Sequence, residues 1–222
     1  MIEELTCAGV AAAEAFEDHG AALFPEERDV VARAVEPRRR EFATARACAR
    51  TALGRLGVDP APIPRGPGGA PRWPVGIVGS LTHCVGYRAA AVAREDSVVT
   101  IGVDAEPNDP LPAGVLDVVA LPEELAALTG RRENVAWDRL LFSAKECVYK
   151  AWFPLAQRWL DFGDVLVTFD PDEAAFRGRL RVGGPALVAE FSGRWLVRDG
   201  LIVTAIALPR DRGARGDPTA RR

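Results

Sequence analysis

The sequence predicts an α+β protein of two pseudosymmetric halves, each an antiparallel sheet packed against helices. Its 222 residues suit one large domain or two small ones. Two helical patterns followed by strand patterns occur before residue 100 and again after it, although no repeat of the residues themselves is visible. We therefore expect an N-terminal half over residues 1–100, a C-terminal half over residues 101–209 and a tail over residues 210–222.

The N-terminal half begins with a small apolar stretch over residues 8–17, which is typical of a strand. Pro25 and the two glutamates after it predict the start of a helix that runs to about Val35, because proline and acids favour a first turn. A second helix is expected from Pro37 to before Gly57, since its apolar residues recur at helical spacing. These are Phe42, Ala45, Ala49, Leu53 and Leu56.

Residues 60–74 are so rich in proline and glycine that they suggest a binding loop rather than a simple connector. Two short apolar runs, over residues 76–81 and 88–94, predict strands on either side of residues 82–86. The apolar run over residues 98–104 predicts a buried strand that begins the second half.

The C-terminal half is expected to contain a helix from Pro122 and a long helix from Trp137 to Trp152. Strands are expected after it, over residues 165–169, 176–182, 186–191, 194–197 and 201–208. The tail carries five arginines and two aspartates among glycine and proline, so it has nothing to bury and is expected to be disordered.

Charge and composition exclude several classes of protein. The tail contributes +3 to a net charge of −3, so the body of the chain carries −6, which argues against nucleic-acid binding. No stretch is apolar enough to cross a membrane, and the acidic N-terminus does not resemble a signal peptide. The four cysteines are scattered and only two histidines occur, so we expect no zinc site. These features predict a cytoplasmic protein with reduced thiols. We also expect the protein to be a monomer.

Lysine occurs only as Lys145 and Lys150, which flank Glu146 within nine residues, whereas the chain contains 26 arginines. Lysine is a compact point charge that can release a proton, while arginine stays charged and presents a planar fork. Chance could place two lysines close together. A catalytic helix is the other interpretation, and it needs support from residues elsewhere.

Asp104 and Glu106 provide that support at the end of the predicted buried strand. Strand alternation places both side chains on one face, with Cα atoms roughly 6.6 Å apart. On the long helix, Glu146 and Lys150 lie together opposite the apolar stripe, and Lys145 projects between. Each pair alone is also typical of a solvated strand end or an ordinary helix ion pair. Three carboxylates and an ammonium together favour Mg²⁺ bound to phosphate oxygens.

Arginines and one histidine are candidate phosphate ligands. Arg38 lies in the first turn of the second predicted helix, and Arg46 lies at the edge of its apolar stripe. A row of guanidiniums there is typical of a solvated flank and can also hold phosphate. His83 closes a predicted strand, where it is either structural or a cation for phosphate.

Two motifs in order resemble the signature of 4′-phosphopantetheinyl transferases of the surfactin and enterobactin (Sfp/EntD-like) type. Gly102-Val103-Asp104-Ala105-Glu106 matches G-[IV]-D-x-E, and residues 142–150 match [FW]-x-x-K-E-x-x-x-K further along the chain. Arg72-Trp73-Pro74 and Ser80-Leu81-Thr82-His83 match two further landmarks of that family. The resemblance covers nearly the whole chain before the tail.

This resemblance implies two α+β halves with the active site between them, and Trp152-Phe153-Pro154 and Trp159-Leu160 are typical of the high-GC bacterial branch. It implies transfer of the phosphopantetheine arm of coenzyme A to a serine of an apo acyl or peptidyl carrier protein, with release of 3′,5′-ADP. Polyketide, nonribosomal-peptide and fatty-acid synthases contain such carriers.

The resemblance also implies roles for single residues. Asp104, Glu106 and Glu146 would hold Mg²⁺ or Mn²⁺, and Glu146 or a water that it orients would be the base. Lys150 would stabilise the leaving phosphate. The residues expected to bind coenzyme A are Arg38, Arg46, Arg65, Thr82, His83, Lys145 and Lys150. Some relatives have Gly-Lys-Pro where this chain has Gly69-Ala70-Pro71, so that phosphate contact is missing or moved to Arg65 or Arg72.

Two other functions would use the same residues. A Mg²⁺-dependent nucleotide pyrophosphatase would release nucleotide whether or not a carrier is present. A non-catalytic module would bind a carrier without turnover. All three acids and both lysines are present, which favours an enzyme, and a metal with a lysine suits attack on a pyrophosphate.

Overall fold

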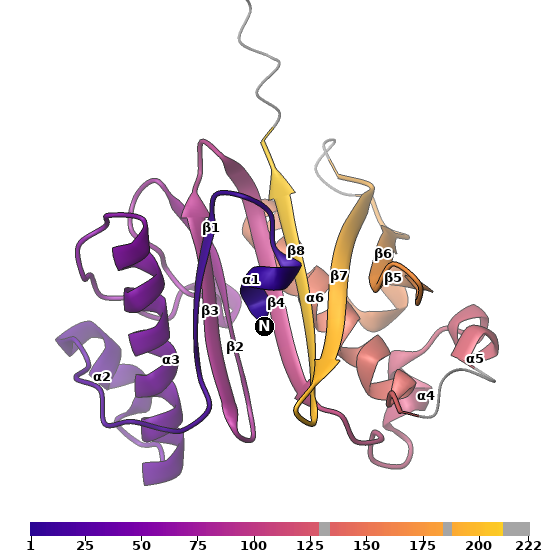
Figure 1. Cartoon of the computed structure of the whole chain (residues 1–222), viewed down its shortest axis with the longest axis horizontal. Helices are drawn as coiled ribbons and strands as arrows, with labels where there is room; N and C mark the ends of the chain where they lie inside the picture. Colours follow the sequence, from indigo (N-terminus) through magenta and orange to yellow (C-terminus); the bar gives the residue numbers. More distant parts are fainter. Residues whose placement is uncertain (129–133, 184–187, 211–222) are drawn as a thin grey trace, which may run out of the picture.

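The computed structural model describes residues 1–128, 134–183 and 188–210. It contains two antiparallel sheets, each packed against a long helix (Figure 1). The strand order is β1-β3-β2 in the smaller sheet and β4-β8-β7-β6-β5 in the larger one. The predicted α+β architecture with antiparallel sheets is therefore confirmed. The tail predicted to be disordered lies outside the described residues, apart from Arg210.

The N-terminal elements follow the predicted order. They are α1 (Ile2–Leu5), β1 (Val10–Ala15), α2 (Pro25–Val31), α3 (Glu36–Arg55), η1 (Pro67–Gly69), β2 (Ile77–Cys84) and β3 (Tyr87–Arg94). Strand β2 is longer than predicted and includes Thr82, His83 and Cys84, so that the turn is confined to Val85 and Gly86. Gly86 has φ +76°, a conformation that glycine adopts without steric cost.

Small side chains allow α3 to lie close to its sheet. Ala49, Ala52 and Leu53 of the helix are fully buried against alanines of β1 and β3. An alanine-rich surface lets the backbones approach, and the resulting core excludes water from both elements.

The C-terminal elements follow the predicted order except for two short helices, α4 and η2, that were not predicted. They are β4 (Val98–Pro107), α4 (Val115–Val119), α5 (Pro122–Leu128), α6 (Trp137–Ala156), η2 (Phe162–Asp164), β5 (Val165–Asp170), β6 (Ala175–Leu180), β7 (Glu190–Arg198) and β8 (Leu201–Pro209). The prediction of two separate strands over residues 186–191 and 194–197 is wrong, because β7 runs through the predicted gap without interruption. Residues 186 and 187 lie outside the described residues. Gly193 does not end the strand. It leaves room for the ring of Phe176, whose Cζ would lie 2.3 Å from a Cβ at that position.

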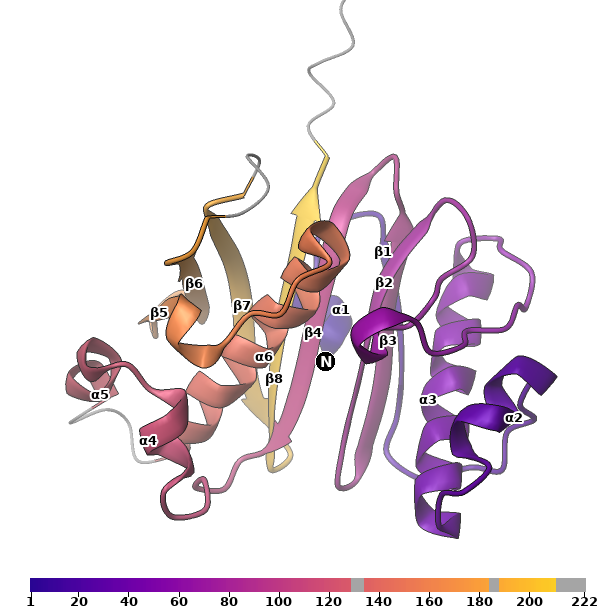
Figure 2. The same ribbon diagram turned by 180° about the vertical axis from the view of Figure 1, so that it is seen from behind.

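Alternation along β4 decides which residues meet α6. Ile101, Val103 and Ala105 point into a core that also contains Ile2 and Leu5 of α1. The alternate residues face α6, which crosses the opposite side of the larger sheet (Figure 2).

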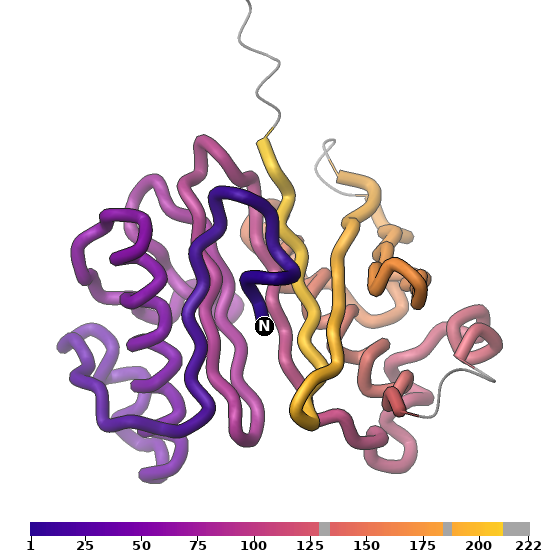
Figure 3. The backbone as a smooth tube through the Cα atoms, in the orientation of Figure 1, coloured from indigo at the N-terminus to yellow at the C-terminus, as the bar shows by residue number. Residues whose placement is uncertain are grey.

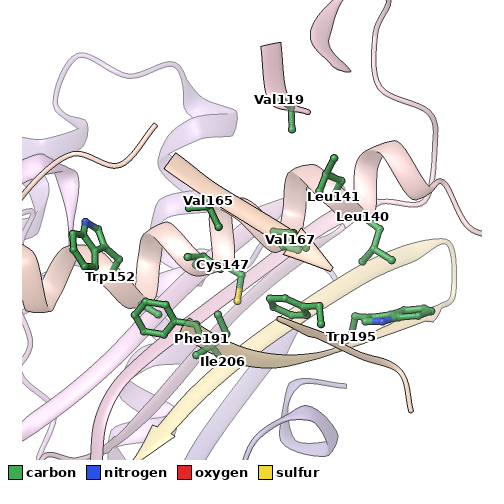
Figure 4. Packing of buried hydrophobic residues seen from close by; sticks show 14 of the residues in the cluster. Val119, Leu140, Leu141, Cys147, Trp152, Val165, Val167, Phe191, Trp195 and Ile206 are labelled. Carbon is green, nitrogen blue, oxygen red and sulfur yellow. The ribbon is translucent and has the colours of Figure 1, made fainter. Parts of the chain in front are cut away.

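Gly102 permits this packing of β4 on α6. A Cβ at that position would lie 2.1 Å from the carbonyl oxygen of Cys147, so only glycine allows the helix and strand to approach so closely. Figure 4 shows Cys147 with its sulfur directed at the sheet. The Cys147 thiol donates to the Gly102 carbonyl at 3.2 Å.

Strands β2 and β4 lie side by side and join the two sheets (Figure 3). Their contact uses side-chain hydroxyls: the Val103 N–H donates to Ser80 Oγ at 3.1 Å, and the Ala105 N–H donates to Thr82 Oγ1 at 2.9 Å. Two hydroxyls of β2 thus satisfy buried amides of β4, since no hydrogen-bonded ladder joins these two strands. This join places the end of β2, with His83, beside the end of β4, with Asp104.

Candidate active site

A pocket of about 640 Å³ lies where elements of both parts of the chain meet. Its walls come from α2 and α3, from the loop over residues 65–73, from β2 and from the exposed side of α6. Gly68 of the loop packs against the ring of Phe153, which closes the pocket on the α6 side. The residues with chemical function on its walls include Arg38, Arg46, Arg65, His83, Glu146 and Lys150.

Asp104 and Lys150 form a buried ion pair beside this pocket. Lys150 Nζ donates to Asp104 Oδ1 at 2.6 Å, and the Thr82 hydroxyl approaches the same oxygen at 3.4 Å. Burial lowers the pKa of Lys150, but the charges of Asp104 and Glu146 outweigh it, so the pKa is raised and the ammonium stays charged. Asp104 Oδ2 is buried and has no hydrogen-bond partner among the described residues.

Glu106 lies on the same face of β4 and is held by a cation from the start of α6. Arg139 Nη1 donates to Glu106 Oε2 at 3.1 Å. Burial and the neighbouring charge of Asp104 raise the pKa of Glu106 to about 6, although Arg139 and Lys150 lower it. The two carboxylates therefore lie close enough to repel each other, as the alternation along the strand predicts.

Glu146 faces the pocket without a fixed partner. Within the described residues no hydrogen bond or ion pair ties down its carboxylate. Burial and the charge of Asp104 raise its pKa, while Lys150 opposes them. A partly buried carboxylate with a raised pKa is able to accept a proton from a substrate hydroxyl.

The three carboxylates fit a divalent cation in their chemistry but are not gathered as a finished metal site. Over the ranges that the structure describes, no three His, Cys, Asp or Glu side chains form a group that could hold a metal ion. Asp104 nevertheless has a buried oxygen without a partner, and its charge raises the pKa of both Glu106 and Glu146. Oxygen ligands of this kind suit Mg²⁺.

Arg38 and His83 meet on the pocket wall, and both contact Glu41. Glu41 accepts from Arg38 Nη1 at 2.7 Å and contacts His83 Nδ1 at 2.5 Å, while Arg38 Nη1 lies 3.1 Å from His83 Nε2. This part of the pocket is therefore lined by a guanidinium and an imidazole that one acid contacts. Sequence reasoning missed Glu41, although its place three residues after Arg38 on a helix is a detectable signal.

Comparison of the chain with known protein families and proteins identifies the family to which it belongs. The description "4′-phosphopantetheinyl transferase N-terminal domain" matches residues 26–93, and "4′-phosphopantetheinyl transferase superfamily" matches residues 100–199. The 4′-phosphopantetheinyl transferase Svp of Streptomyces mobaraensis is 54% identical over 207 residues, which are 90% of this chain and 84% of Svp. The chain belongs to the 4′-phosphopantetheinyl transferase family.

Two further relatives agree with this result. The 4′-phosphopantetheinyl transferase PptT of Mycobacterium tuberculosis is 50% identical, with 90% of this chain and 92% of PptT covered. The 4′-phosphopantetheinyl transferase Npt of Nocardia iowensis is 48% identical, with 93% of this chain and 99% of Npt covered. The protein is therefore an enzyme that transfers phosphopantetheine from coenzyme A to carrier proteins.

Arg46 and Arg65 approach the pocket of the transferase from α3 and from the loop. Arg46 Nε donates to the Ile63 carbonyl at 2.8 Å, and its guanidinium lies 4.1 Å above the Phe42 ring. Burial lowers the pKa of Arg46 to about 10, with Arg50 and Arg38 adding to the effect and Glu27 opposing it. Arg65 lies against Gly69, where a Cβ would be 2.8 Å from its Nη2.

Lys145 does not reach this pocket. Its Nζ is buried on the far side of α6 and contacts Glu124 Oε2 at 2.7 Å, the Val119 carbonyl at 2.8 Å and the Phe162 carbonyl at 2.9 Å. Burial lowers the pKa of Lys145, while Glu124 opposes the shift. The expectation that Lys145 contacts coenzyme A therefore needs correction: its three donors are used within the protein. It borders a separate cavity of about 90 Å³.

None of the described helices is both long enough and apolar enough to cross a bilayer.

Proposed function

We propose that the 640 Å³ pocket is the site of transfer, with Asp104, Glu106 and Glu146 as the ligands of Mg²⁺ or Mn²⁺. The observation that supports this most is the 2.6 Å contact between Lys150, which lines the pocket, and Asp104, because it joins the two signature motifs beside the pocket. A divalent cation bound there would neutralise charge on the pyrophosphate of coenzyme A.

The side chains of the transferase would share the remaining work. Glu146, or a water that it orients, accepts the proton of the carrier serine, for which its raised pKa is suitable. Lys150 donates to the pyrophosphate and stabilises the negative charge of the leaving 3′,5′-ADP. Thr82 supports Asp104 through its hydroxyl.

The 3′-phosphate of coenzyme A would lie beside Arg38 and His83. Both line the pocket, as do Arg46 and Arg65. Charge-assisted hydrogen bonds from guanidinium and imidazolium groups are well suited to a phosphomonoester. Lys145 has no role in this scheme.

We also propose that the enzyme acts as a cytoplasmic monomer of two halves that meet near residue 100. Its carrier substrates are acyl and peptidyl carrier proteins of polyketide, nonribosomal-peptide or fatty-acid synthases. This assignment rests on the family and on the carriers that such enzymes serve.

A carrier assay tests the proposal. The protein is incubated with coenzyme A, Mg²⁺ and an apo carrier, and the mass of the carrier is followed. Glu146→Gln should lower turnover by at least about 10²-fold, the scale of losing a general base. Glu123→Gln, at an exposed position on α5, is the matched control and should leave turnover unchanged.

Two outcomes would contradict the proposal. Near-normal activity of Glu146→Gln would remove that carboxylate from the chemistry. Release of nucleotide from coenzyme A at the same rate with and without carrier would instead indicate a pyrophosphatase.

A further inference from the structure

Glu41 is placed to orient Arg38 and His83 without lining the pocket itself. Its side chain is 18% exposed, whereas those of Arg38 and His83 are 46% and 40% exposed. Glu41 does not line the pocket, but both of its partners do. The Glu41 carboxylate thus lies behind the guanidinium and the imidazole and contacts each of them with a different oxygen.

We propose that Glu41 is a positioning residue that gives the transferase its preference for a nucleotide carrying a 3′-phosphomonoester. It does so by holding Arg38 and His83 side by side on the wall of the pocket. The inference rests on the proposed function, in which these two side chains bind the 3′-phosphate of coenzyme A.

The contacts of His83 assign the position of its proton. Nδ1 lies 2.5 Å from a carboxylate oxygen, so Nδ1 carries the proton and donates it, because a carboxylate can only accept. Nε2 lies 3.1 Å from Arg38 Nη1 and therefore accepts in the neutral ring. Glu41 thus selects the tautomer with its proton on Nδ1 and leaves the lone pair on Nε2, which accepts from Arg38 while no phosphate is bound.

The surrounding charges explain why a phosphate would complete this arrangement. Burial lowers the pKa of His83, and Arg38, Lys150 and Arg88 lower it further, while Glu41 alone raises it. These groups come from α3, α6 and β3, the elements that face the ring. A phosphomonoester dianion would offset the cations and accept the Arg38 donor that faces Nε2 in the free protein. It would thereby favour protonation at Nε2, which then donates to the phosphate.

Glu41 itself remains ionised throughout. Burial raises its pKa, but the hydrogen bond from Arg38 and the charges of His83, Arg38 and Arg88 outweigh burial and lower it. The carboxylate therefore keeps its two contacts before and after a phosphate binds.

Binding of two nucleotides tests the proposal without any need for turnover. Adenosine 3′,5′-bisphosphate and adenosine 5′-monophosphate are titrated into the full-length protein by calorimetry. Wild type should prefer the bisphosphate. Glu41→Ala should reduce this preference about tenfold or more, the scale of losing charge-assisted hydrogen bonds, with little change for the monophosphate.

Two further variants sharpen the result. Glu41→Gln should fall between wild type and Glu41→Ala, because the amide oxygen can accept from His83 while the amide nitrogen cannot accept from Arg38. Glu36→Gln is the control, since Glu36 forms an exposed ion pair with Arg40 on the same helix and does not line the pocket. It should keep the full preference.

The tautomer of His83 gives a second readout that a general loss of stability would not move. The chain has only two histidines, so ¹⁵N spectra of the imidazoles can be assigned with His19→Gln. Wild type should show the proton on Nδ1, and Glu41→Ala should shift it toward Nε2.

The outcomes separate this inference from the proposed function. If Glu41→Ala keeps the wild-type preference or tautomer, the role of Glu41 is refuted. If wild type itself binds both nucleotides equally, the placement of the 3′-phosphate is refuted and the inference fails with it.

Discussion

Glu106→Gln should stabilise the transferase at neutral pH when no divalent metal is present, although it removes a proposed metal ligand. Burial and the charge of Asp104 raise the pKa of Glu106 from 4.5 to about 6, even with Arg139 and Lys150 opposing them. The folded protein therefore disfavours the charged carboxylate, and a neutral glutamine of similar shape removes that cost.

The size and sign of the effect follow from the pKa shift. A rise of about 1.5 units corresponds to roughly 2 kcal/mol at about 1.36 kcal/mol per unit. Below pH 4.5 the carboxyl is protonated in both the folded and unfolded chain, so there is no cost. As the pH rises through about 6, the fold must accept the charge and the full cost develops. For a chain of this length, 2 kcal/mol corresponds to a Tm shift of about 4–8 °C.

Thermal unfolding across pH 4.5 to 8 in the presence of a chelator measures this difference. Glu106→Gln should have a higher Tm than wild type at neutral pH, and the difference should shrink toward the acid end. Glu36→Gln, which alters an exposed ion pair, should show no such pH dependence. Replacing the chelator by Mg²⁺ should raise the Tm of wild type more than that of Glu106→Gln. A difference in Tm that is independent of pH would refute the reasoning.

The other predictions concern packing, the lysines and substrate binding. Gly102→Ala should cost about 1–3 kcal/mol or more of stability, because the added Cβ would lie 2.1 Å from a backbone oxygen of α6. Gly54→Ala, on the open side of α3, should instead stabilise by up to about 1 kcal/mol, and equal Tm values for the two variants would contradict this account. Lys145→Arg should lower the free energy of unfolding by about 2 kcal/mol or more, whereas Lys150→Arg should keep the Tm and lower kcat. A loss of stability in Lys150→Arg together with a loss of kcat alone in Lys145→Arg would contradict the roles given to the two lysines. Arg46→Ala should raise KM for coenzyme A more than it lowers kcat, and an unchanged KM would remove Arg46 from the binding site.

Local patterns were sufficient for most elements of the fold and for the position of the acids. Period-2 alternation placed Asp104 and Glu106 on one face of β4, and the glycine before them allows α6 to pack there. The predicted break between residues 191 and 194 was wrong, because β7 is continuous there and the space at Gly193 is filled by the ring of Phe176 from the neighbouring strand. The packing of a ring against a glycine on the neighbouring strand depends on a residue from another part of the sequence, so the local pattern around Gly193 does not predict it.

The sequence did not predict which side chains of the site contact one another. Helical spacing pairs Lys150 with Glu146, yet its ammonium contacts Asp104, which is 46 residues away. Glu41 escaped notice for the same reason, since its contact with His83 requires α3 to lie beside β2. Short-range spacing predicts which residues share a face, while tertiary packing decides which of them touch.

The surroundings of Lys145 and Lys150 explain why lysine, rather than arginine, occupies these two positions. Lys145 Nζ lies among three oxygens from three separate segments, and an ammonium with three donors satisfies them from one point. A planar guanidinium with five donors would leave some unpaired in a buried site, which is costly. Lys150 meets a single buried oxygen and has room for a substrate phosphate on its exposed side. A composition that otherwise uses arginine thus keeps lysine where geometry requires a point charge, once for stability and once, by our proposal, for chemistry.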